Sequence, residues 1–258
     1  MVAQVAKILI YPIKSLDGVL CDSITIVPPG TLNFDRRWAI FDLQGKYVNG
    51  KQNPQVHELR TEFDLSQLIV TFYDQQKPVS FNLATETDEI NQWLSEYFQQ
   101  QVFLREEIAG GFPDDREAYG PTVISTATLE AVASWFPPLT VENVRTRFRA
   151  NLEISGVPPF WEDQLFGETG KVMHFEVGSA QLEGVNPCQR CIVPTRNPET
   201  GEQYPQFQQI FIQQRQASLP SWTIPSRFNH YYRLSVNTRI PPSEAGKIIS
   251  VGDRVISS

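Results

Sequence analysis

The run VAKILIYP, from Val5 to Pro12, opens a series of short segments rich in β-branched and aromatic residues. Such segments favour β-strands, because these side chains fit a pleated, half-buried surface. Turn-like sequences such as DLQGK and YDQQKP separate them at short intervals. Strands spaced so closely predict a barrel or sandwich for the first hundred residues. The predicted strands cover residues 5–12, 23–27, 37–43, 68–73 and 78–83.

One amphipathic helix interrupts this series. It begins at Thr87 and carries acidic residues in its first turn, which is typical of a helix N-terminus. A Gly- and Asp-rich segment, residues 108–120, then predicts a loop between two domains, 1–107 and 108–258. The residues on the apolar face of the helix are Ile90, Trp93, Leu94 and Tyr97.

The second domain begins with helices and continues with strands. STATLEAVASWF predicts a helix capped by Ser125, and residues 140–148 predict a second helix. Residues 205–216 fit either a helix or a loop. The predicted strands are ANLEIS, KVMHFEVG, AQLEGV, CIVPT, HYYRLSV and KIISVGDRVIS. We therefore expect a mainly β protein of the α+β class, with two β-rich domains and a few covering helices.

Length and composition indicate an ordinary globular protein of 258 residues, 41% of them hydrophobic. The formal net charge of −7 argues against nonspecific nucleic-acid binding, which needs an excess of basic residues. Three cysteines cannot all pair within one chain and are few for this length, which indicates a reducing compartment. No leader sequence or membrane-spanning run is visible, so we expect a cytoplasmic protein without membrane contact.

Two cysteines, Cys188 and Cys191, lie close together in NPCQRCIVPTRNPETGEQ, residues 186–203. A structural zinc site needs four ligands, and the remaining cysteine and three scattered histidines supply no second ligand pair. A thioredoxin-like pair needs a strand-to-helix junction, whereas CIVPT predicts a strand. Two interpretations remain: buried small side chains, or one thiolate that is favoured by the neighbouring Arg190 and binds a soft metal or attacks an electrophile.

Basic residues beside the predicted strands are candidates for anion binding. Lys14 and Ser15 directly follow the first strand, and a lysine with a hydroxyl suits phosphate. In strand geometry Arg36 and its neighbour Arg37 point to opposite faces, so at most one reaches the same site. Arg149 and Asn151, two residues apart at the start of a strand, share one face and form a candidate anion clamp.

Other charged residues carry weaker signals. Arg145 and Arg147 fit the solvated face of a helix. Glu162 and Asp163, beside Trp161, fit either a surface turn or a carboxylate that moves protons near a metal.

Several segments, taken together and in order, resemble the MOSC-domain family with an N-terminal MOSC β-barrel. This family includes the mitochondrial amidoxime-reducing component and its bacterial counterparts. The segments span almost the whole chain, so the resemblance is more specific than any one motif. They are YPIKSLDGV, FDRRWAIFD, RFRANLEISG with PFWEDQLFG, NPCQRCIVPTRNPETGE and ISVGDRV.

The resemblance implies a molybdenum cofactor, a pterin dithiolene whose metal takes one further sulfur from a cysteine. The matching cysteine is Cys191, and Cys188 is then a neighbour. Lys14, Ser15 and Arg36 match residues that meet the cofactor's phosphate. The residues that match the rest of the cofactor pocket are Arg149, Asn151, Gln189 and Arg190. Ala150 stands where relatives often have proline.

The implied activity is the two-electron reduction of N-hydroxylated compounds such as amidoximes, hydroxylamines and N-hydroxylated bases. We expect Asp163 to assist proton delivery. The chain lacks the four cysteines of a [2Fe–2S] ferredoxin domain, so the expected electron donor is a separate ferredoxin or flavoprotein. The alternative is a carrier of sulfur or of the cofactor, with a persulfide on Cys191.

Overall fold

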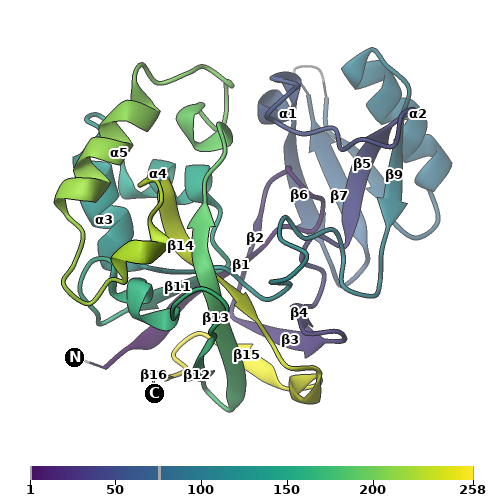
Figure 1. Cartoon of the computed structure of the whole chain (residues 1–258). Helices are drawn as coiled ribbons and strands as arrows, with labels where there is room; N and C mark the ends of the chain where they lie inside the picture. Colours follow the sequence, from purple (N-terminus) through teal and green to yellow (C-terminus); the bar gives the residue numbers. More distant parts are fainter. Residues whose placement is uncertain (1, 75–76, 258) are drawn as a thin grey trace.

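The largest sheet takes its strands from both ends of the chain (Figure 1). The structure, a computed structural model, describes residues 2–74 and 77–257. The eight strands, in order across the sheet, are β16 (Val255–Ser257), β12 (Met173–Val177), β13 (Ala180–Gln189), β14 (Arg233–Arg239), β10 (Val123–Ser125), β11 (Leu152–Ser155), β1 (Gln4–Ile10) and β2 (Val19–Cys21). Only β10 and β11 pair in parallel; the other neighbours are antiparallel.

This sheet curls back on itself at β1. The Val5 amide donates to the Asp253 carbonyl at 2.8 Å, and the Val255 amide donates to the Ala3 carbonyl at 2.9 Å. The start of β1 therefore contacts the segment before β16 as well as its ladder partners. A second, three-stranded sheet lies against the large one through a shared apolar core. Its strands are β15 (Ile248–Ser250), β3 (Ser23–Val27) and β4 (Thr31–Leu32).

Residues 38–106 form a smaller lobe beside the large sheet (Figure 1). Helix α2 covers its strands, and Ile90 and Leu94, one turn apart on α2, pack with Val70 and Phe72 in a fully buried core. The elements of the lobe are β5 (Trp38–Asp42), α1 (Gln55–Glu58), β6 (Arg60–Asp64), β7 (Ile69–Tyr73), β8 (Val79–Asn82), α2 (Thr87–Phe98) and β9 (Val102–Glu106). β5 pairs with β9, and β6, β7 and β8 form a three-stranded sheet.

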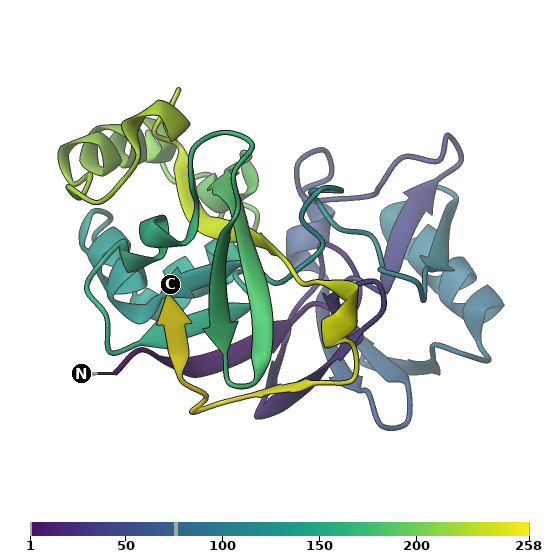
Figure 2. The ribbon, with the colours of Figure 1, turned by 60° about the horizontal axis from the view of Figure 1, so that its bottom comes forward.

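The remaining α-helices belong to the larger lobe, which comprises the rest of the described chain. They are α3 (Thr126–Ser134), α4 (Val141–Phe148) and α5 (Phe207–Ala217). They share an apolar core with β10 and β14 that includes Phe136, Phe148 and Phe211. Figure 2 shows that both chain ends lie on this lobe. Four short 3₁₀ helices complete the described part of the chain: η1 (Trp161–Leu165), η2 (Val193–Thr195), η3 (Pro225–Arg227) and η4 (Pro242–Glu244).

The prediction of a mainly β, α+β protein is confirmed. The helix from Thr87 is confirmed, and so is the Ser125 cap, whose hydroxyl accepts from the Thr128 amide at 3.1 Å. The ambiguous segment 205–216 is helical from Phe207 onward. Part of the turn predicted at YDQQKP, Gln75 and Gln76, lies outside the described residues.

One local prediction is wrong, and one strand starts a residue later than predicted. CIVPT is not a strand but leads into η2, because Pro194 has no amide to donate to a ladder and the Thr195 hydroxyl bonds back to the Ile192 carbonyl at 2.7 Å. The strand predicted from Arg37 begins at Trp38, and Arg36 has a left-handed backbone with φ of 52°. Strand alternation therefore does not decide where the Arg36 side chain points.

The chain connects the two lobes twice, between β4 and β5 and between β9 and β10. Strands β1 to β4 pair within the larger lobe, although they precede the smaller lobe in sequence. The boundary at residues 107 and 108 stays a prediction. No helix in the described residues has the length and apolar character needed to cross a membrane.

Candidate functional site

A cavity of about 770 Å³ is lined by residues of both lobes and of the loop that follows β9. This volume falls in the range of small-molecule and cofactor sites. All but two of the site residues expected from the sequence line it. The expected residues that line the cavity are Lys14, Ser15, Arg36, Arg149, Gln189, Arg190 and Cys191. The two exceptions are Asn151 and Asp163.

Lys14 lies where the chain leaves β1 and turns. Its amide donates to the Trp38 carbonyl at 2.7 Å, and Ser15 next to it has a left-handed φ of 76°. The ammonium donates to the Phe112 carbonyl at 2.9 Å and to Asp114 Oδ1 at 2.6 Å. Burial lowers the pKa of Lys14, and Asp114 offsets this only in part.

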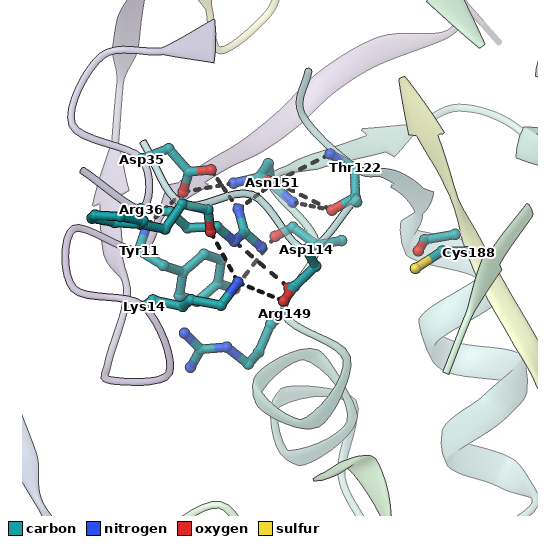
Figure 3. A network of polar contacts seen from close by, with 12 residues as sticks. Tyr11, Lys14, Asp35, Arg36, Asp114, Thr122, Arg149, Asn151 and Cys188 are labelled. Carbon is teal, nitrogen blue, oxygen red and sulfur yellow. Dashed lines mark hydrogen bonds and ion pairs between the residues drawn. The ribbon is translucent and has the colours of Figure 1, made fainter. Parts of the chain in front are cut away.

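Arg36 lies beside Lys14 in a tightly bonded cluster (Figure 3). Its guanidinium pairs with Asp35, and its Nε lies 3.9 Å from Asp114 Oδ2. Asp35 is fixed in turn, because Oδ1 accepts from the Tyr11 amide at 2.8 Å. Burial acts to lower the pKa of Arg36, but Asp35 and Asp114 outweigh it and hold that pKa above its ordinary value.

Asn151 lies behind this cluster and is 0% exposed. Its amide nitrogen donates to the Leu9 carbonyl at 2.9 Å and to Asp35 Oδ1 at 3.1 Å, and its oxygen accepts from the Thr122 amide at 3.1 Å. The sequence predicted that Asn151 lines the pocket. The structure gives it a different place, in which it orients Asp35 and also accepts from Arg36 Nη1 at 3.4 Å.

Arg149 ends α4 in a left-handed conformation, with φ of 53°. Its Nη2 donates to the Leu16 carbonyl at 2.6 Å, and its guanidinium lies 4.0 Å from the centre of the Tyr11 ring. Among the described residues no carboxylate forms an ion pair with it. Burial lowers its pKa. A half-buried arginine without a counter-ion on a cavity wall indicates an anion-binding site.

The two cysteines lie on the wall formed by the end of β13. Cys188 belongs to the strand, whereas Cys191 follows it, just before η2. Both thiols are free and line the cavity. Arg190 Nη1 donates to Cys188 Sγ at 3.1 Å, so the arginine expected to favour a thiolate contacts Cys188 rather than Cys191. Figure 3 shows Cys188 apart from the Lys14 and Arg36 cluster.

The segment that carries Cys191 is anchored at both of its ends to α4. Arg190 Nη2 donates to the Phe148 carbonyl at 2.6 Å, and Arg147 Nη1 donates to the Pro194 carbonyl at 3.0 Å. The expectation that Arg147 lies on a solvated face is wrong, since it is only 3% exposed. Arg145 pairs with Glu153 instead of facing solvent alone.

The cavity contains a carboxylate that the sequence analysis missed. Asp115 Oδ2 accepts from Asn186 Nδ2 at 3.2 Å and from Asn237 Nδ2 at 3.4 Å. Asn186 and Cys188, two residues apart in β13, both line the cavity. The only sequence signal was the Asp114–Asp115 pair in a loop, which is common at surfaces.

Asp163 does not lie in the cavity. Its carboxylate is buried and pairs with Arg215 Nη2 at 2.5 Å, and Oδ2 accepts from the Thr223 hydroxyl at 2.9 Å. Arg215 is 1% exposed and lies between the rings of Phe160 and Phe228. The expected role of Asp163 in proton delivery is therefore replaced by a structural one, an ion pair in the core.

Glu162, next to it, should make stability depend on pH. Burial and then Asp163 raise its pKa to about 7 from an ordinary 4.5. The folded chain thus holds the proton more tightly, and the free energy of unfolding should fall by about 3 kcal/mol as pH rises from 4.5 to 7. Urea unfolding at pH 5 and pH 8 measures this.

The variant Glu162→Gln should lose most of that pH dependence, since an amide replaces the neutral acid. Its Oε2 partner, the Thr128 hydroxyl at 3.0 Å, can still bond. Asp22→Asn, an exposed carboxylate, serves as the control and should keep the wild-type profile. An unchanged pH dependence in Glu162→Gln would contradict the assignment.

Comparison with known protein families identifies the family of the chain. The family model described as "MOSC N-terminal beta barrel domain" matches residues 2–101, and the model described as "MOSC domain" matches residues 117–256. The chain therefore belongs to the MOSC-domain family.

Among curated proteins, the chain is similar to two kinds of relative. It is 26% identical over 225 residues to the molybdenum cofactor sulfurase of Caenorhabditis elegans, which covers 78% of this chain and 30% of the relative. It is 25% identical over 240 residues to human mitochondrial amidoxime-reducing component 1, with 78% of this chain and 68% of the relative covered. The chain thus spans about 30% of the sulfurase's length.

Among solved structures, the YUAD protein from Bacillus subtilis aligns with 99% of this chain and 94% of its own, at 13% identity and a TM-score of 0.40.

The residues of the cavity fit a molybdenum cofactor. One end offers Lys14, Arg36 and the unpaired Arg149, which suit a phosphate. The other end offers two free thiols, which suit a thiophilic metal. Buried Nε atoms of Arg190 and Arg233, both on the thiol wall, have no hydrogen-bond partner within the described part of the chain, and each is a donor left for a ligand or water.

Proposed function

We propose that the chain binds a molybdenum cofactor in this cavity and reduces N-hydroxylated compounds by two electrons. One observation carries the proposal: a single cavity joins a cluster of anion-binding cations to two free thiols. Similarity to human mitochondrial amidoxime-reducing component 1 supports the substrate class. The proposed setting is the cytoplasm, with electrons supplied by a ferredoxin or flavoprotein.

The residues of the chain have separate tasks in this proposal. Lys14, Ser15, Arg36 and Arg149 hold the phosphate, and Cys191 gives its sulfur to the metal. Arg147 and Arg190 fix the segment that carries Cys191. When bound, the cofactor supplies the two-electron redox chemistry. The substrate takes up two electrons and two protons, its N–O bond breaks, and water leaves.

The test is the reduction of benzamidoxime and N-hydroxyadenine by protein made in a host that synthesises the cofactor, with reduced viologen as the electron source. We expect amine-type products from at least one substrate and about one molybdenum per chain. A loaded molybdenum site without turnover on either compound would exclude the reaction class. Full loading with sulfane sulfur and no molybdenum would favour the persulfide carrier, a reading that the similarity to cofactor sulfurases keeps relevant.

Removing either phosphate-binding cation should weaken cofactor retention. Lys14→Ala and Arg149→Ala each delete a charge-assisted hydrogen-bond donor, so we expect about 10- to 100-fold faster loss of the pterin. The rate is measured from the fluorescence of the oxidised pterin after gel filtration. Lys46→Ala removes an exposed lysine outside the cavity and should change nothing. Unchanged retention in both cavity variants would refute the phosphate assignment.

A further inference from the structure

The cations assigned to the phosphate already hold an internal anion. Asp114 places one carboxylate oxygen 2.6 Å from the Lys14 ammonium and the other 3.9 Å from Arg36 Nε (Figure 3). Phosphate oxygens bridging the same two cations would occupy the same position. Desolvation at the cavity wall acts to raise the pKa of Asp114, but Arg36 and Lys14 outweigh it and keep that pKa below its ordinary value. The carboxylate is therefore charged and competes for these cations.

We infer that Asp114 is a displaceable occupant of the anion site, which leaves Lys14 and Arg36 when a phosphate binds. The inference rests on the proposed function, because it concerns the regulation of the same site. Asp35, the other carboxylate on Arg36, cannot play this part. Its side chain is 11% exposed and is held by the Tyr11 amide and Asn151, whereas the side chain of Asp114 is 74% exposed.

The loop that carries Asp114 allows this movement. Phe112 anchors the loop on one side, since its amide donates to the Arg36 carbonyl at 2.8 Å and its ring packs on Phe41. Asp115 anchors it on the other side through Asn186 and Asn237. Asp114 lies between these anchors, so its side chain can turn to solvent while the loop stays attached to both walls of the cavity.

The charge balance of the cluster favours a phosphate once Asp114 has left. Lys14, Arg36 and Arg149 carry three positive charges, against Asp35 and Asp114. Without Asp114 the cluster has three cations and one carboxylate, an excess of two, which matches a phosphate monoester near neutral pH. With Asp114 in place the excess of these five groups is one, so the aspartate lowers the affinity of the cluster for a phosphate.

Phosphate binding to the full chain, prepared from a host that lacks the pterin pathway, tests the inference. Isothermal titration calorimetry with inorganic phosphate at pH 8 and low salt compares wild type with Asp114→Asn. Because the competing carboxylate is itself largely exposed to solvent, we expect a modest effect, about two- to fivefold tighter binding in Asp114→Asn. Glu117→Gln, an exposed carboxylate in the same loop outside the cavity, should bind as wild type does.

A second variant separates displacement from a general effect of cavity charge. Asp115→Asn removes the same charge from the same cavity but contacts neither Lys14 nor Arg36. We expect a smaller gain than in Asp114→Asn; an equal gain, or no gain in Asp114→Asn, would overturn the inference. If Lys14→Ala weakens phosphate binding and cofactor retention while Asp114→Asn has no effect, only this inference fails. If neither Lys14→Ala nor Arg149→Ala changes phosphate binding or cofactor retention, the proposed phosphate site fails with it.

Discussion

Replacing Cys191 with serine should remove the molybdenum and with it the reductase activity. The serine hydroxyl stays protonated and is a weak ligand for a thiophilic metal. Even changes to groups that only orient a metal ligand cost about 10- to 100-fold in metal affinity. We therefore expect metal content and turnover to fall by more than about a hundredfold. Elemental analysis and benzamidoxime reduction measure the two effects on the same preparation.

Cys188→Ser is the matched control, because both cysteines line the same cavity three positions apart. Cys188 is the thiol that Arg190 contacts, so geometry alone leaves the two in competition as metal ligand. If Cys191 is the ligand, Cys188→Ser should retain most of its metal. Loss of metal in Cys188→Ser with retention in Cys191→Ser would reverse the assignment.

Replacing Asp163 with alanine should destabilise the fold but leave the catalytic turnover of the loaded protein unchanged. It leaves the Arg215 guanidinium buried between two aromatic rings without its counter-ion. Breaking a buried pair from one side costs about 3–5 kcal/mol. Urea unfolding should show this loss, while turnover per folded, molybdenum-loaded molecule stays near wild type.

A double variant and a surface variant complete this test. Asp163→Leu combined with Arg215→Met replaces both charges by apolar groups and should recover much of the lost stability. Asp22→Asn, on the surface, should change stability by no more than about 0.5 kcal/mol. A fall in turnover per loaded molecule in Asp163→Ala, with little change in unfolding, would restore the catalytic interpretation of Asp163.

Features that depend on residues close in sequence were predicted correctly. Features that depend on contacts with residues distant in sequence were missed. Lys14 and Ser15 were singled out because they follow the first strand, and they line the cavity. Arg149 also lines it, but the expected reason was wrong, since Arg149 ends α4 and neither it nor Asn151 lies in the strand β11. Asp163 was misjudged because its partner, Arg215, comes from a helix 52 residues later. Trp161, Glu162 and Asp163 look like a surface turn, but Glu162 bonds to Thr128 of α3 and Asp163 bonds to Arg215 of α5.

Arg145 and Arg147 show the same limit within one helix. Both were expected to face solvent, and periodicity on eight residues of α4 could not separate them. Arg147 is buried because the carbonyls of Pro194 and Arg196, from the segment beyond Cys191, approach it. The Cys188–Arg190 contact depends likewise on the Phe148 carbonyl, which fixes the guanidinium.

Both connections between the lobes pass through the cavity wall. The first contributes Asp35 and Arg36, and the second contributes the loop with Asp114 and continues to Thr122. A ligand that fills the cavity would therefore contact both connections at once and hold the two lobes together. Its binding energy adds to the stability of the whole chain, so cofactor loading should raise the melting temperature of both lobes together and sharpen their unfolding into one transition.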